Sequence, residues 1–170
     1  MLAAFLNVDA AEVTGRGAGL SDEKLINKQK IIRQAIAINK PNQDDPIDVL
    51  HKLGGLDLAA LTGYFIGAAA SGTAVVIDGF ITAVAALTAI RLAPAVRGYL
   101  FPSHLSAEPG ARIALEEIGL SAWFTCGMRV GEGTGCCVAF DLFGQAMAAY
   151  DNIATWAEAG IGADVPQGDK

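Results

Sequence analysis

The chain has 170 residues, of which 52% are hydrophobic and 18% charged, and its formal net charge is −6. This length suits one domain with a sizeable core, and the composition excludes a chain that is disordered over most of its length. Nucleic-acid-binding proteins hold phosphates with clustered Lys and Arg, so this acidic balance predicts no nucleic-acid partner.

The cysteines and the first residues bear on the cellular compartment. Cys136 and Cys137 are adjacent and do not readily form an unstrained disulfide, and neither they nor Cys126 have the spacing of a metal site. We therefore expect small, reduced core cysteines in a cytoplasmic protein, and no bound metal. Residues 1–6 are apolar but lack the basic flank of a signal peptide, so we expect a helix cut in mid-course.

One segment raises the question of a membrane helix. Residues 58–77 carry no charge, and Gly63 and Gly67 have the small-xxx-small spacing of membrane helix pairs. Against this, residues 71–73 interrupt the run and β-branched residues follow. We predict a buried helix that packs closely on a sheet through its glycines, then a buried strand, and no membrane partner.

The first third of the chain predicts helices around a glycine-rich loop. Asp9 and Glu12 have the spacing of a capping box, which starts a short helical turn. The loop 14–19, with three alternating glycines, either approaches a ligand closely or forms a tight connection between helices. An amphipathic helix over 22–39 follows. On position alone, Lys28 in its second turn is a solvated surface lysine.

The middle of the chain predicts helix, strand and helix in succession. Asp45 and Pro46 form a strong helix start, and that helix ends at Gly54. Asp57 is expected to cap the next helix. A buried parallel strand then spans 73–77.

Asp78 stands at the carboxyl end of that strand, before a helix over 80–92. In doubly wound sheets ligands sit beyond the carboxyl ends of the strands, so Asp78 lies where chemistry is expected. It is equally well placed to cap the helix, and both interpretations stay open.

The last third repeats the pattern. A short strand over 97–102 leads to His104 and Ser106, and a helix over 107–118 follows. Ser106 with Glu108 can simply cap that helix, and His104 can be a structural histidine, because they form no recognisable nucleophile set.

A third strand over 125–130 and a long apolar helix over 136–159 complete the prediction. The fold class is α/β: a Rossmann-like parallel sheet with flanking helices and a long C-terminal helix.

Glu132 is the most informative residue, because glycines on both sides let a flat substrate approach its carboxylate closely. The spacing G-x-G-x-G is not the dinucleotide fingerprint, so no nicotinamide dinucleotide is inferred. Helix-start amides would keep the carboxylate a weak base, whereas an apolar pocket would raise its pKa toward the working pH. A capping role and a catalytic role both remain open on the residues alone.

Five motifs in register resemble those of the nicotinate-nucleotide:dimethylbenzimidazole phosphoribosyltransferase family, which makes the lower-ligand nucleotide of cobalamin. The resemblance covers nearly the whole chain and is specific because the motifs share order and spacing. They are Asn27-Lys28, Gly54-Gly55-Leu56-Asp57, Val76-Ile77-Asp78-Gly79-Phe80, Pro102-Ser103-His104-Leu105-Ser106-Ala107-Glu108 and Met128-Arg129-Val130-Gly131-Glu132-Gly133-Thr134-Gly135.

The resemblance implies a reaction in which a dimethylbenzimidazole nitrogen displaces nicotinate from nicotinate mononucleotide, giving alpha-ribazole phosphate. Glu132 matches the general base of the family. Lys28 falls on a lysine of the nucleotide site, where its charge can neutralise phosphate. Asp78 and Ser106 match polar strand-end positions that hydrogen-bond ribose, phosphate or nicotinate. The remaining predicted substrate-binding residues are Gly131 and Gly133, which allow close approach of the ring.

The resemblance also implies a domain organisation. Residues 1–160 are expected to form the C-terminal part of the phosphoribosyltransferase α/β domain, truncated at the N-terminus, with 161–170 as a tail. The first half of the family fold is expected to be missing, including a glycine-rich Asn-Thr-Thr loop that helps to bind phosphate. Cys136 and Cys137 replace the small residues, such as alanine, expected there.

Two kinds of function follow. The first is an enzyme without cofactor, a homodimer acting on small-molecule substrates, whose activity needs a missing or separate N-terminal half. The second is a non-catalytic fragment or assembly module, which lacks that half of the active site and pairs through an exposed sheet edge.

Overall fold

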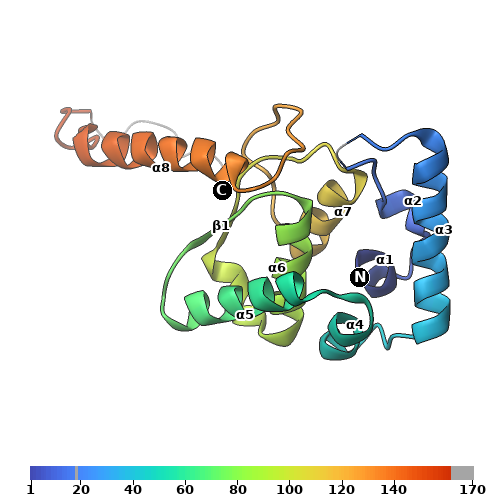
Figure 1. Ribbon diagram of the computed structural model, residues 1–170. Helices are drawn as coiled ribbons and strands as arrows, with labels where there is room; N and C mark the ends of the chain where they lie inside the picture. The colour runs from blue at the N-terminus through green and yellow to red at the C-terminus, as the bar shows by residue number, and fades with distance from the viewer. Residues whose placement is uncertain (18, 162–170) are drawn as a thin grey trace. The chain divides into compact units, whose positions relative to one another are not determined.

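The computed structural model describes residues 1–17 and 19–161, and its chain divides into two compact units, Met1–Ala139 and Phe140–Lys170 (Figure 1). The predicted tail 161–170 lies outside the described residues except for residue 161. The elements in chain order are α1 (Leu2–Leu6), α2 (Ala10–Val13), α3 (Asp22–Asn39), α4 (Pro46–Leu53), α5 (Leu56–Ala70), β1 (Val75–Ile77), α6 (Phe80–Leu92), the 3-10 helix η1 (Pro94–Tyr99), β2 (Leu100–Pro102), α7 (Pro109–Ile118) and α8 (Thr134–Asn152).

A small parallel sheet organises the first unit. β1 pairs with β2 in the register Val75 to Leu100 and Ile77 to Pro102. In the sequence, α6 connects β1 to η1 and β2, and it packs against α5, α7 and η1 (Figure 1). Every residue from Ala83 to Ala89 on α6 is buried, so this alanine-rich helix lies at the centre of the core. The predicted α/β class is confirmed, with two parallel strands among the described residues.

The helix starts follow the predicted capping chemistry. Asp9 and Glu12 form a complete capping box at α2. The Ser21 side chain accepts from the Lys24 amide at the start of α3, which spans the predicted 22–39. The Asp45 carboxylate accepts from the amides of Ile47 and Asp48, and α4 ends before Gly54 as expected.

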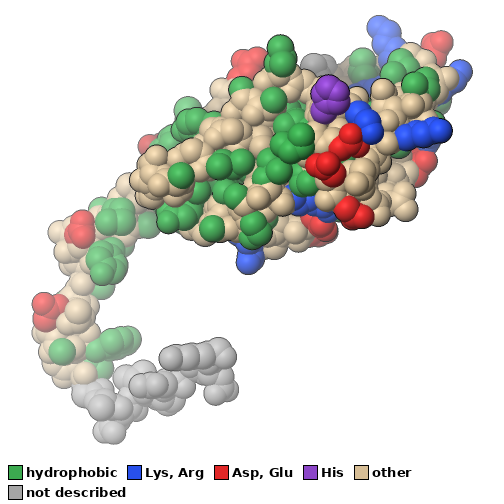
Figure 2. All heavy atoms as spheres, turned by 90° about the horizontal axis from the view of Figure 1, so that it is seen from below, with side chains coloured by type: hydrophobic (Ala, Val, Ile, Leu, Met, Phe, Trp, Pro, Cys, Tyr) green, Lys and Arg blue, Asp and Glu red, His purple; other side chains and the backbone are tan. Residues whose placement is uncertain are grey.

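The prediction for α5 is wrong in two respects. Gly55 is its N-cap, so Asp57 lies in the first turn and does not cap the helix. The helix was also expected to be buried, but only its Thr62 and Phe65 are, whereas Leu56 is 91% exposed. Figure 2 views the molecule from below, the side where α5 lies in Figure 1, and green apolar side chains are scattered over that surface.

The glycines of α5 also lie differently from the prediction. A Cβ atom added at Gly63 or Gly67 would meet nothing within 4 Å, so neither makes a close helix contact among the described residues. None of the described helices is long and apolar enough to cross a membrane.

The third predicted strand, 125–130, does not form. In its place a single parallel bridge joins His104 to Phe124. The amides of Leu105 and Ala107 donate to the carbonyls of Phe124 and Met128, so two residues on one side span four on the other and the ladder register is lost. Gly127, with φ 61°, turns the backbone out of the extended path.

Further boundaries and the cysteine environment also differ. The first strand begins at Val75 rather than at residue 73, and α7 begins at Pro109 rather than at residue 107. The second strand is confined to β2 because η1 occupies residues 94–99. The last helix spans 134–152 rather than 136–159. Cys126 and Cys137 are exposed and Cys136 is half-buried, so the cysteines are not core residues, although all three are free thiols.

The second unit contains the rest of α8 and a turn. At the last residue of the helix, Asn152 donates from Nδ2 to the Ala148 carbonyl. Glu158 then accepts from the amide and the hydroxyl of Thr155, and these bonds lower the pKa of the Glu158 carboxyl.

Candidate active site

Asp78 follows β1 directly and is 8% exposed. Its Oδ2 accepts from the Gly133 amide at 3.1 Å, and its Oδ1 accepts from the Gly135 amide at 3.0 Å. The N-cap of α6 is Gly79, without a side-chain bond, so Asp78 does not cap the helix that follows it. Its carboxylate instead joins the end of β1 to the predicted catalytic loop, 55 residues further along the chain.

Ser103 and His104 support Asp78 from the end of β2. The Ser103 hydroxyl donates to the Ile77 carbonyl at 2.7 Å and lies 3.0 Å from the Asp78 carbonyl. His104 is buried, with Nδ1 at 3.1 Å from the Ser103 hydroxyl and 4.0 Å from Asp78 Oδ1. His104 is therefore a buried structural histidine whose ring nitrogen has a hydrogen-bond partner in Ser103, as the sequence allowed.

The loop around Glu132 has three successive residues in the left-handed region, with φ values of 77° at Gly131, 57° at Glu132 and 79° at Gly133. Glycine adopts this region freely, but an L-residue such as glutamate rarely does. The Thr134 amide and hydroxyl both bond the Gly131 carbonyl, which closes the turn into α8.

Glu132 itself is exposed. Among residues 1–17 and 19–161 its carboxylate has no hydrogen bond or ion pair, so it is not a helix cap of the kind considered from the sequence. A Cβ atom added at Gly133 would meet no atom within 4 Å, and one at Gly131 would have its nearest contact at 3.9 Å, at Asp78 Oδ2. Both glycines thus leave open space beside the Glu132 backbone.

Lys28 lies elsewhere in the first unit, in a cavity of about 260 Å³. Its Nζ donates to the Gly15 carbonyl at 3.1 Å, and the side chain is half-buried rather than fully solvated. Glu108 faces the same cavity, and its Oε1 accepts from the Gly17 amide at 2.9 Å. Lys28, Glu108 and the glycine loop therefore line part of a hollow large enough for a phosphate-sized group, and most of its other lining residues are apolar.

Gly15 has no room for a side chain. An added Cβ atom would overlap the Glu108 carboxylate and lie 2.6 Å from Pro109 Cδ. The glycine-rich loop thus lies against the start of α7, and its backbone approaches a carboxylate closely, whether or not a ligand binds.

Ser106 lies two residues before Glu108 in the sequence. It is buried, and its hydroxyl accepts weakly from the Glu108 amide at 3.4 Å. The structure thus brings together Asp78, Gly131, Glu132 and Gly133 in one cluster, and Lys28 with Glu108 in another. Glu132 does not line the cavity of Lys28.

The thiol nearest to Asp78 is not suited to nucleophilic chemistry. Cys136 Sγ lies 3.7 Å from the Val76 carbonyl oxygen. Burial raises the pKa of the Cys136 thiol to about 11, and the charge of Asp78 contributes to the rise. At neutral pH Cys136 is therefore protonated. Within the described residues no three His, Cys, Asp or Glu side chains are grouped so that they could hold a metal ion.

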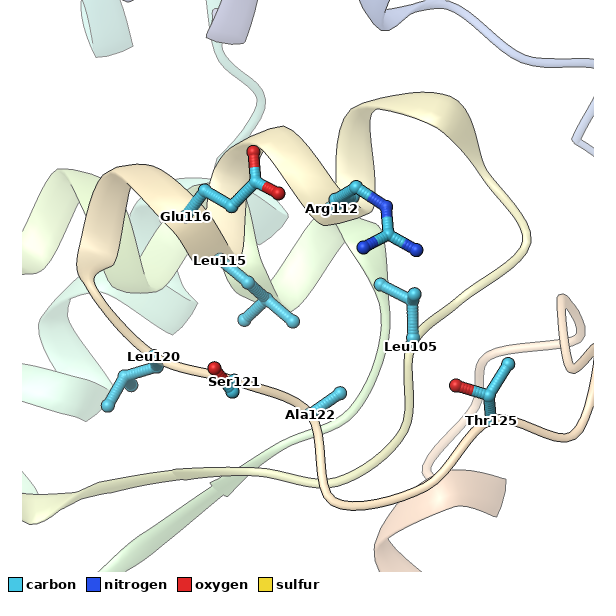
Figure 3. A pocket seen from close by; sticks show the side chains of 8 residues that line it. All are labelled: Leu105, Arg112, Leu115, Glu116, Leu120, Ser121, Ala122 and Thr125. Carbon is cyan, nitrogen blue, oxygen red and sulfur yellow. The ribbon is translucent and has the colours of Figure 1, made fainter.

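A third region is an open cavity of about 260 Å³ between α7 and the segment that follows it. Figure 3 shows Arg112, Leu115 and Glu116 projecting from α7, opposite Leu120 to Ala122 on the following segment. None of the predicted site residues lines this cavity, so it is separate from both clusters.

Two roles were missed from the sequence. Glu108 was considered only as a helix cap, and the partners of Asp78 were not foreseen. The signal for Glu108 was a carboxylate inside the Pro102 to Glu108 motif together with an unexplained glycine loop upstream. Neither the Gly17–Glu108 bond nor the Gly133–Asp78 bond leaves a local pattern in the sequence, because 91 and 55 residues separate the partners.

The comparisons with known proteins agree with one another. Residues 1–161 match a family model described as Phosphoribosyltransferase. The chain is 52% identical over 153 residues to the nicotinate-nucleotide–dimethylbenzimidazole phosphoribosyltransferase of Ruminiclostridium cellulolyticum, which covers 90% of this chain and 44% of that protein. The Acetivibrio thermocellus protein of the same name is 49% identical, over 93% of this chain and 45% of its own length.

Solved structures show the same similarity. The crystal structure of CobT from Thermus thermophilus superposes with a TM-score of 0.86 at 36% sequence identity, covering 95% of this chain and 48% of that chain. The chain thus spans less than half the length of these relatives.

Proposed function

Since the chain belongs to the phosphoribosyltransferase family of the nicotinate-nucleotide–dimethylbenzimidazole enzymes, we propose that it supplies the catalytic carboxylate of that reaction. The substrates in this proposal are nicotinate mononucleotide and dimethylbenzimidazole, and the products are alpha-ribazole phosphate and nicotinate. Residues 1–160 form the C-terminal part of the family's α/β domain. The reaction is assigned to the cytoplasm, in keeping with three free thiols.

In the proposed reaction one ring nitrogen of dimethylbenzimidazole attacks the anomeric carbon of the nucleotide. The bond from that carbon to nicotinate breaks, nicotinate leaves with the bonding electrons, and the configuration inverts. The other ring nitrogen loses its proton to the Glu132 carboxylate, which acts as general base. No cofactor takes part in these steps.

The observation that carries this proposal is the unengaged carboxylate of Glu132. A carboxylate already bonded to amides or cations would be a poor proton acceptor, because those bonds stabilise its charged form. Glu132 has no such bond among the described residues, and the glycines beside it leave space for a planar ring. A second protein surface closing over this exposed side chain would desolvate it and make it a stronger base.

The other substrate contacts are proposed around the two clusters. Lys28 binds the phosphate of the nucleotide through its point charge, in the cavity that it shares with Glu108. Ser106 and Asp78 contribute hydrogen bonds at the strand ends, and Gly131 with Gly133 allow the ring to approach.

The test is to incubate the chain with both substrates, with and without the N-terminal portion of a relative, and to measure alpha-ribazole phosphate. In the reconstituted enzyme Glu132→Gln should lower kcat by about 10²–10⁴-fold while nucleotide binding survives, as for a lost general base. Unchanged turnover would remove Glu132 from this role. Asp44→Asn, an exposed carboxylate outside both clusters, is the matched control and should leave kcat unchanged.

A second candidate is a non-catalytic assembly module, which the exposed face of α5 favours. Leu56 and Tyr64 are 91% and 61% exposed, and the sheet of the described residues has two strands, β1 and β2. In this alternative the chain pairs with a second copy, or with a separate N-terminal half, and has no turnover of its own. Light scattering measures the molar mass of the chain alone and then in the presence of that half, and so distinguishes pairing with a second copy from pairing with the N-terminal half.

A further inference from the structure

We infer that Asp78 is the positioning residue of Glu132: its carboxylate holds the Gly131 to Gly135 loop in the conformation that presents the proposed base. This inference rests on the proposed function. It replaces the substrate hydrogen bonds proposed above for Asp78 with a role through the loop backbone, and leaves the other substrate contacts as proposed.

The first argument is the pair of bonds that Asp78 makes. Both carboxylate oxygens are used, one by the amide directly after Glu132 and the other by the Gly135 amide in the first turn of α8. Amides at a helix start have no partner within the helix, and a carboxylate is the acceptor that complements them best. Asp78 therefore fixes the loop and the helix start to one point.

The second argument is the backbone of the loop. Glu132 has a left-handed backbone conformation, and so do Gly131 and Gly133 on either side of it. An L-residue stays in such a sparsely populated region when surrounding contacts determine it. The side chain of Glu132 makes no hydrogen bond or ion pair among the described residues, so backbone bonds hold this conformation: the Thr134 bonds to the Gly131 carbonyl close the turn, and the Gly133 and Gly135 amides tie it to Asp78.

The third argument is that Asp78 is itself held firmly. It is buried, it follows a strand directly, and Ser103 and His104 surround it. Aspartate has only two side-chain torsions, so a buried aspartate at a strand end has little freedom. A base must be held within a fraction of an ångström of its productive position, and such an anchor suits this requirement.

Gly135 shows how closely these parts fit together. A Cβ atom at this position would overlap the His104 ring and lie 2.8 Å from Ser103 Oγ. The start of α8 therefore approaches the end of β2 more closely than any other residue type would permit. This close approach brings the Gly135 amide within bonding distance of Asp78.

The alternative is that Asp78 binds a substrate directly, through lone pairs that the amides leave free. The two roles predict different kinetics. A residue that binds substrate equally in ground and transition states raises KM when removed, whereas a residue that positions the base lowers kcat.

The first experiment needs no activity. Hydrogen exchange is measured over residues 131–137 of the 170-residue chain for wild type, Asp78→Ala and Asp78→Asn, with circular dichroism as the check of folding. We expect exchange in this segment to accelerate at least about tenfold in Asp78→Ala and less in Asp78→Asn, which keeps one acceptor oxygen. Equal exchange in wild type and a folded Asp78→Ala would overturn the inference. Asp44→Asn is the control and should not alter exchange.

The second experiment uses the reconstituted enzyme. Asp78→Ala should lower kcat about 100-fold with KM changed less than about threefold, in the range expected for loss of general-base catalysis. The decisive comparison is Asp78→Ala in a Glu132→Gln background. If Asp78 acts through Glu132, the double variant is no slower than Glu132→Gln alone, because effects through one group are not additive.

These outcomes separate the inference from the proposed function. A rise in KM at constant kcat, or a full additional loss in the double variant, overturns the positioning role and leaves Glu132 as base. Unchanged turnover in Glu132→Gln overturns the base, whereas the exchange result would still establish Asp78 as the anchor of the loop.

Discussion

Two glycine-rich loops in the first unit are held in the same way, each by a carboxylate from a distant part of the chain. The loop of Gly15 and Gly17 gives one amide to Glu108, and the loop of Gly133 and Gly135 gives two amides to Asp78. The shared arrangement shows how this fold fixes loops that have no regular structure of their own.

The difference between the anchors matches the proposed tasks of the loops. Glu108 is a longer side chain, half-buried, and it lines an open cavity beside Lys28. Asp78 is short, buried and directly attached to a strand. Binding a mobile charged phosphate tolerates a flexible anchor, whereas proton transfer requires a rigid one. Perturbing the Asp78 loop should therefore have the larger effects.

The largest effect on stability is expected from Gly135→Ala. The new methyl group would overlap His104, so the start of α8 must move away from Asp78. Overpacking of this kind costs about 1–3 kcal/mol of unfolding free energy, which urea unfolding followed by circular dichroism would measure.

The control for this prediction is Gly63→Ala on α5. An added Cβ atom there meets nothing within 4 Å, so the higher helix propensity of alanine should stabilise the chain by about 1 kcal/mol. A Gly135→Ala variant as stable as wild type would show that the close approach of α8 and β2 is not needed.

A smaller effect is expected from Glu108→Gln at the other loop. The amide oxygen can still accept from Gly17, but the bond is no longer charge-assisted, so about 1 kcal/mol of unfolding free energy should be lost. Glu116→Gln on α7 is the matched control: this side chain is exposed, and the change should stay within about 0.5 kcal/mol. A loss at Glu108 equal to that of Gly135→Ala would contradict the proposed ranking of the two loops.

How far the sequence predicts this molecule depends on the range of the interactions. The starts of the helices over 22–39 and 46–53 could be predicted to the residue, because local caps at Ser21 and Asp45 determine where they begin. The strand expected over 125–130 could not be excluded, because its residues have strand-like composition. Its failure comes from Gly127 and from a mismatched pairing with residues 105–107.

The candidate site divides along the same line. The sequence singled out Glu132 because its flanking glycines are local features. Asp78 was selected through its place at a strand end and through family resemblance, yet the role that its bonds indicate depends on a loop 55 residues away. Glu108 was missed as an anchor for the same physical reason: no local pattern encodes which amide a distant carboxylate accepts.

The smallest expected effect is on the reactivity of Cys136, which reports on the charge of Asp78. With its pKa raised to about 11 by burial first and then by Asp78, on the order of 0.1% of this thiol is ionised at pH 8, so iodoacetamide should modify it more slowly than exposed Cys126 or Cys137. Asp78→Asn removes the neighbouring charge, which should lower the pKa and speed alkylation of Cys136 severalfold.

Mass spectrometry of the modified peptides would measure these rates, with Cys126 as internal control because its rate should not change in Asp78→Asn. The same raised pKa gives a sign for stability. Folding raises the pKa of the Cys136 thiol from its ordinary value of 9.0 to about 11, so ionisation of the thiol favours the unfolded chain. The free energy of unfolding should therefore fall as the pH rises from 9.0 to about 11. Faster alkylation of Cys136 than of Cys126 in wild type would mean that the start of α8 opens readily. Asp78 would then not hold its loop rigidly, and the proposed difference between Asp78 and Glu108 as anchors would be wrong.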